Sequence, residues 1–209
     1  MATELDGAAR GTANGAAPAR TRPDARLQQL GGSAAVAAAG ITVLAWMRPD
    51  GPTWLLTAGA VLGGLLLPVA AALLAKAFVG DRAPLSWAKL GGIALIIYSC
   101  GWLVPHALAP LLPGGPAAMA VTGTWDAVRI LGGAVAAAAI AARWPVRGFN
   151  RWSMLLVVAG DILSQSSWLA AAAGAQPLMT AMTLAWPLSV LALGLGHALS
   201  GRRRLRAEA

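Results

Sequence analysis

Charged residues are scarce in this sequence. Of its 209 residues only 11% are Asp, Glu, Lys or Arg, whereas 57% are hydrophobic, and the mean hydropathy is +0.64. A soluble globular domain carries about 25% charged residues. The composition therefore argues against an ordinary soluble domain and indicates a protein of the lipid bilayer.

Cysteine, histidine and known catalytic motifs are also nearly absent. Cys100 is the only cysteine, which excludes an intrachain disulfide and a thiolate metal cluster. The two histidines, His106 and His197, have no further metal ligand at a suitable spacing on their own segments, so we expect packing or interfacial roles for both. No Walker loop, Rossmann glycine pattern, HExxH or GxSxG sequence occurs. We therefore predict no cofactor and no metal site.

Long apolar runs dominate the chain, and each approaches or exceeds the ~20 residues that a helix needs to cross a bilayer. Gly- and Pro-rich segments separate them, because these residues end helices. The runs are continuous rather than alternating, which excludes spanning strands. The sequence predicts an all-α polytopic membrane protein with six transmembrane helices at Leu30–Met47, Thr53–Ala75, Leu90–Leu112, Ala117–Ala142, Trp152–Ala173 and Leu178–Leu199.

Positive charge falls on alternate connections between these runs. Fourteen of the sixteen Lys and Arg residues lie in the two tails, between the second and third runs, or between the fourth and fifth runs. The other connections carry only Arg48, and Arg129 lies inside a run. Because cytoplasmic loops are enriched in Lys and Arg, we predict a cell (plasma) membrane protein with both termini in the cytoplasm.

The predicted organisation is a disordered basic cytoplasmic tail over residues 1–27, a six-helix transmembrane bundle over 28–200 and an Arg-rich cytoplasmic tail over 201–209. The formal net charge of +8 is spread over loops and tails without a basic face that contains aromatic residues. We therefore expect the lipid bilayer, and no nucleic acid, as the partner of this charge. Six spans without a detectable repeat favour work as a homodimer or with a partner membrane subunit.

Three ionisable residues fall near the middle of neighbouring runs. Arg129 lies at the centre of the fourth run and Asp126 shares its face at the i,i+3 spacing, while Asp161 lies near the centre of the fifth run. Intramembrane ionisable residues usually mark a functional site. The predicted ligand-binding site comprises Tyr98, Trp125, Asp126, Arg129, Asp161, Gln165 and Trp186.

Two aspartates and one arginine leave one negative charge over, so either one carboxyl stays protonated or a proton or cation occupies the site. The plain structural alternative is that Asp126 and Arg129 form a neutral pair that fixes helix register, with a protonated Asp161 bonded to a carbonyl.

These residues favour a transport or ligand-binding bundle with a mid-depth Asp/Arg/Asp site for a proton, cation or polar solute. A second hypothesis is a membrane enzyme for a prenyl or lipid substrate. In that enzyme Asp126 or Asp161 is the catalytic general acid, and a cation is stabilised by the rings of Trp102, Trp125, Trp168 and Trp186. A third is a non-catalytic sensory or assembly subunit.

Overall fold

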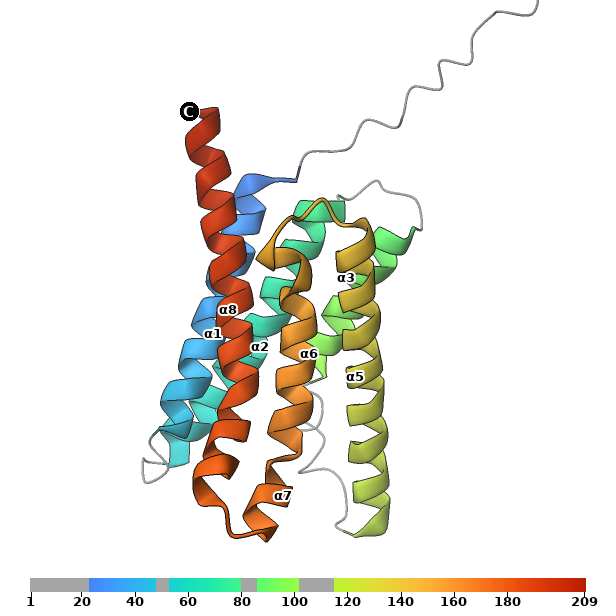
Figure 1. Cartoon of the computed structure of the whole chain (residues 1–209), viewed down its shortest axis with the longest axis vertical. Coiled ribbons are helices and arrows are strands. Elements are labelled where there is room, and N and C mark those ends of the chain that lie inside the picture. Colours follow the sequence, from blue (N-terminus) through green and yellow to red (C-terminus); the bar gives the residue numbers. More distant parts are fainter. Residues whose placement is uncertain (1–22, 48–52, 80–85, 102–114) are drawn as a thin grey trace, which may run out of the picture.

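The computed structural model describes residues 23–47, 53–79, 86–101 and 115–209 of the chain. Every regular element in these ranges is an α-helix, which confirms the predicted all-α class (Figure 1). The helices are α1 (Ala25–Trp46), α2 (Thr53–Val79), α3 (Trp87–Cys100), α5 (Pro116–Arg143), α6 (Phe149–Gln165), α7 (Ser167–Ala172) and α8 (Gln176–Glu208).

The helices form a closed circuit in chain order. Each of α1, α2, α3, α5 and α6 packs against the next long helix along the chain, and α8 closes the circuit by packing against both α6 and α1. In Figure 1 the front layer is formed by α8, α6 and α5, with α1, α2 and α3 behind it. Helices α5 and α6, which carry Arg129 and Asp161, pack against each other.

Five described helical segments are long and apolar enough to cross a membrane, which makes this a multi-pass membrane protein by length and composition. The fifth predicted run forms two helices, α6 and α7, which together make one candidate span. The third predicted run begins in α3, a helix of 14 residues, and continues into residues 102–114, outside the described ranges. The third of the six predicted spans thus stays a prediction.

The ends of the first and last helices differ from the predicted boundaries. Helix α1 begins at Ala25 because the Asp24 carboxylate accepts hydrogen bonds from the Arg26 and Leu27 backbone amides, at 2.9 and 3.0 Å, and so caps its first turn. Helix α8 continues without a break through the Arg-rich segment to Glu208. Residues 1–22, most of the predicted N-terminal tail, lie outside the described ranges.

Small residues let the helices approach closely. A Cβ atom at Gly194 of α8 would lie 2.8 Å from the Gly32 carbonyl oxygen of α1, so only glycine fits this contact. Large apolar side chains such as Leu62, Leu131 and Leu188 are exposed on the outside of the bundle. That distribution is the one expected where lipid, rather than water, surrounds the helices.

Candidate functional site

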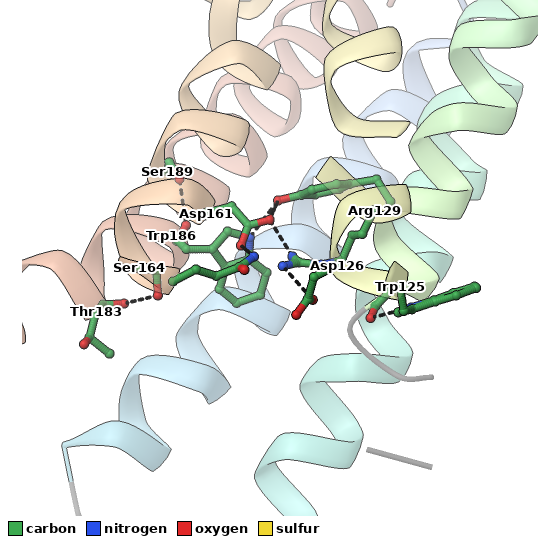
Figure 2. A network of polar contacts seen from close by, with 11 residues as sticks. Trp125, Asp126, Arg129, Asp161, Ser164, Thr183, Trp186 and Ser189 are labelled. Carbon is green, nitrogen blue, oxygen red and sulfur yellow. Dashed lines mark hydrogen bonds and ion pairs between the residues drawn. The ribbon is translucent and has the colours of Figure 1, made fainter. Parts of the chain in front are cut away.

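The site is built around the Asp161 carboxylate of α6, which is 0% exposed. One of its oxygens, Oδ2, accepts hydrogen bonds from Arg129 Nη1 and from the Tyr98 hydroxyl, the latter at 3.0 Å. The other oxygen, Oδ1, accepts from Gln165 Nε2 at 3.2 Å. Helices α3, α5 and α6 therefore converge on one buried carboxylate, as Figure 2 shows. Three donors, one of them the positively charged Arg129, therefore surround this carboxylate.

Arg129 enters this centre from the middle of α5 and is 3% exposed. Its side chain passes over Gly101 at the end of α3, where a Cβ atom would clash with the aliphatic part of the arginine. Its guanidinium carbon lies 5.8 Å from the centre of the Tyr98 ring, a distance at which a cation and an aromatic face attract. The local sequence therefore provides both room for the arginine and a ring that favours its charge.

Tyr98 is held from two sides. Its hydroxyl donates to Asp161 and accepts a hydrogen bond from the Trp186 indole Nε1 of α8 at 3.0 Å. Its ring lies against Gly133, where a Cβ atom would come within 2.8 Å of Tyr98 Cδ2. Trp186 is itself 5% exposed. The buried network thus reaches α8 as well, and four helices position its side chains.

Asp126 has different surroundings from Asp161. Its side chain is 42% exposed, and its one hydrogen-bonding contact in the described chain is with Arg129 Nη2 at 3.4 Å, one helical turn away. Such a distance and exposure make a weak ion pair. Asp126 therefore keeps acceptor capacity and access that Asp161 lacks (Figure 2).

The charges of the three residues do not cancel. Arg129 carries one positive charge against two carboxylates, and its shorter contact is with the fully buried Asp161. Asp126 is consequently the carboxyl group that Arg129 compensates less. Chemically, the arrangement can attract a proton or a small cation to a carboxylate in an apolar bundle, and it disfavours an anion.

The structure brings six of the seven predicted ligand-binding residues into one network. The exception is Trp125, whose indole Nε1 donates to the Gly101 carbonyl oxygen at 3.1 Å and which lies away from Asp161 in Figure 2. Of the plain structural alternative, the Asp126–Arg129 pair is present at 3.4 Å, but Asp161 is the closer partner of Arg129 and is bonded to side-chain donors rather than to a carbonyl.

The other singled-out aromatic and histidine residues lie elsewhere. Trp168 of α7 is 65% exposed and takes no part in the network. Trp102 and His106 lie outside the described ranges. His197 of α8 is 2% exposed, with Gln28 Nε2 3.4 Å from its Nδ1 and Phe78 packed edge-on against its ring, so its predicted packing role is confirmed. Among the described residues no group of three His, Cys, Asp or Glu side chains could hold a metal.

Two glycines that make room for the site were not among the predicted site residues. Gly101 and Gly133 admit the Arg129 side chain and the Tyr98 ring, yet neither carries a group that would draw notice in an Ala- and Gly-rich chain. The sequence offered a signal only for Gly133, which lies four residues after Arg129 on one helical face.

A small cavity lies beside Tyr98 along the bundle axis. Its volume is about 30 Å³, counted as space for the centre of a water-sized sphere, and its lining is nearly all apolar, with Ala35, Leu95 and Met154 among the contributors. A cavity that can hold a water needs about 10–15 Å³ of such space and polar partners. The scarcity of polar groups in its lining makes this cavity a packing gap rather than a solute site, and of the two carboxylates Asp126 is the exposed one.

Comparisons with protein-family models, with curated proteins and with solved structures found no match to this chain.

Proposed function

We propose that this protein is a membrane transporter or ligand-binding protein whose site at Asp126, Arg129 and Asp161 takes up a proton or a small cation. The observation that carries the proposal is the unequal burial of the two carboxylates. Asp161 is 0% exposed and bonded to three donors, whereas the Asp126 side chain is 42% exposed with one weak contact. In this assignment the Asp126 carboxylate binds and releases the proton or cation, and Asp161 holds Arg129 in position.

The arginine has a defined task in this proposal. Because Arg129 pairs closely with Asp161, it neutralises the Asp126 carboxylate only in part and leaves that carboxylate exposed. An arriving cation competes with a 3.4 Å contact rather than with a tight pair, so binding and release both remain accessible. A transported ion must bind favourably enough to enter the site and weakly enough to leave it.

The proposed topology has six spans and both termini in the cytoplasm. Helix α3 occupies the place of the third span in the closed circuit, between α2 and α5. The described basic residues outside the site gather at the helix ends where α1 begins and where α2, α5 and α8 finish. The positive-inside rule assigns that end to the cytoplasm and the chain to a cell membrane. A homodimer or a partner membrane subunit remains part of the proposal, because one ring of six helices is small for a transporter.

The described geometry does not favour the enzyme hypothesis. Its proposed cation-stabilising ring at Trp168 lies on the outside of the bundle, and Asp161 is bonded on both oxygens. A sensory or assembly protein would show no ion flux, so this third hypothesis is one outcome of the test below.

The test is ion flux in proteoliposomes. Vesicles loaded with pyranine, or with sodium- or potassium-sensitive dyes, receive an inward gradient of the corresponding ion with the membrane potential clamped. We expect flux above that of protein-free vesicles for the wild type and its loss in Asp126→Asn. The matched control Glu208→Gln makes the same acid-to-amide change at the exposed end of α8 and should keep full flux. Absence of wild-type flux for all three ions, or full flux in Asp126→Asn, would overturn the proposal.

A further inference from the structure

The C-terminal end of α8 carries four arginines within five residues, at positions 202, 203, 204 and 206. Because α8 is one continuous helix from Gln176 to Glu208, these residues keep fixed directions around its axis. Figure 1 shows this end of α8 extending beyond the ends of the neighbouring helices. The segment is thus a rigid basic projection at the end of the bundle.

Three of the arginines form one face. At ~100° per residue, Arg203 and Arg206 lie within about 100° of Arg202 around the helix. All three are exposed, while Arg204 is partly buried. Gly201, which is buried against α1 with the position of its Cβ only 2.7 Å from the Ala25 carbonyl oxygen, lies outside this sector. We call Arg202, Arg203 and Arg206 the arginine face; it points away from the rest of the bundle.

The arginine face has no acidic partner in the described part of the chain. Neither described ion pair involves its members, and no further interaction of these side chains exists among the described residues. Arg202 and Arg206 stand one helical turn apart, where like charges repel and destabilise a helix. A helix that holds three guanidinium groups together without a counter-charge is stabilised by an external anion.

The depth of the face identifies that anion. The apolar part of α8 from Leu178 to Leu199 spans about 33 Å, close to the hydrocarbon thickness of a bilayer. Arg202 then lies about 5 Å and Arg206 about 10 Å beyond Leu199 along the helix. The headgroup layer of each leaflet is about 5–8 Å thick. Arg202 and Arg203 therefore start within the headgroup layer, and the Arg206 side chain reaches back into it because helical side chains tilt toward the N-terminus. The face thus meets lipid phosphates, whose oxygens guanidinium groups bind through paired hydrogen bonds.

We propose that the arginine face of α8 is a binding site for anionic phospholipid headgroups, which docks the end of this helix on the membrane surface. This site is separate from the Asp126 centre, and the proposal does not depend on whether the protein transports ions. Each basic residue near an anionic surface changes lipid affinity by about fivefold, so removal of two should change it by about thirtyfold.

The test compares phosphatidylglycerol binding by native mass spectrometry for the full chain in detergent. Arg202→Gln/Arg206→Gln should weaken binding about thirtyfold, whereas Arg202→Lys/Arg206→Lys should keep most of it. The matched control Arg143→Gln/Arg147→Gln removes the same charge, at the same spacing and at the same end of the bundle. That control should weaken binding clearly less than the α8 pair, because Arg143 and Arg147 supply only a general attraction to the anionic surface.

Hydrogen exchange in nanodiscs locates the effect. Amides of residues 200–208 should exchange more slowly in phosphatidylglycerol discs than in phosphatidylcholine discs, and the difference should vanish in the Gln pair. Equal exchange in both lipids would overturn the proposal. So would equal lipid loss in the control pair, or the same protection in phosphatidylcholine discs given only inorganic phosphate, which would assign the face to a soluble phosphate.

Discussion

Removal of Arg129 should destabilise the protein far more than removal of Asp126. The Arg129→Met variant keeps the length and apolar stem of the side chain but deletes the charge that faces Asp161. The carboxylate left behind is 0% exposed, and only Tyr98 and Gln165 would still donate to it. Breaking a buried ion pair by deleting one partner costs about 3–5 kcal/mol, because it leaves an uncompensated charge in an apolar interior.

The contrasting variant is Asp126→Asn. Its side chain is 42% exposed and its ion pair with Arg129 is long, at 3.4 Å. Pairs of this kind contribute about 0–1 kcal/mol. The structure therefore predicts a gap of at least about 2 kcal/mol between the two variants, although they remove opposite ends of one charge cluster.

The measurement is the free energy of unfolding in detergent, followed by tryptophan fluorescence. A double variant separates the ion pair from general damage: Arg129→Met/Asp161→Asn removes both charges while the Asn oxygen can still accept from Tyr98. It should be more stable than Arg129→Met alone, with a coupling energy of about 2–3 kcal/mol. The reasoning is refuted if Arg129→Met costs less than about 1 kcal/mol, or if the double variant is no better than the single one.

Three further stability predictions follow from single contacts. Gly101→Ala places a Cβ against the Arg129 side chain and should cost about 1–3 kcal/mol by overpacking, measured by the same unfolding titration. Tyr98→Phe removes the hydroxyl between Asp161 and Trp186 and should cost about 1–3 kcal/mol, with Trp186 emission altered, because that indole loses its acceptor. Gln28→Met removes Oε1, the buried side-chain atom without a hydrogen-bond partner in the described chain, but it also removes the Nε2 group that lies 3.4 Å from His197 Nδ1. Because these two effects oppose each other, the free energy of unfolding should change by less than about 1 kcal/mol, and a loss above about 2 kcal/mol would contradict this.

The convergence of the charged residues was predictable because physics leaves few choices for them. An ionised side chain in the middle of an apolar run must turn inward and find a partner. Arg129 and Asp161 lie at similar depth on consecutive runs joined by a short loop, so their contact follows. Tyr98 and Gln165, two other residues of the predicted site, also bond to Asp161.

The unequal roles of the two aspartates could not be predicted from the sequence. Both are acidic residues near the middle of a run, and nothing in the sequence favours one of them over the other as the partner of Arg129. The choice of Asp161 depends on how far α5 is rotated toward α6, and that rotation is set by close approaches at Gly101 and Gly133. A sequence of many Ala and Gly residues does not reveal which small residue makes the contact.

Helix ends were the least predictable part of the fold. The Asp24 cap starts α1 five residues before the first predicted apolar residue, Leu30, because capping is a local hydrogen bond rather than a matter of hydropathy. Similarly, α8 continues past its apolar part because arginine is a good helix former.

The most direct test of the central claim is carboxyl modification of the wild-type protein by a hydrophobic carbodiimide, with the modified residues read by peptide mass spectrometry. We predict an adduct on Asp126 and no adduct on Asp161. The yield on Asp126 should fall when sodium or potassium salt is added at fixed pH, because a bound cation protects the carboxyl group. Modification of Asp161 at a rate equal to that of Asp126, or an unreactive Asp126, would contradict the assignment of one carboxylate to the ligand and the other to the arginine.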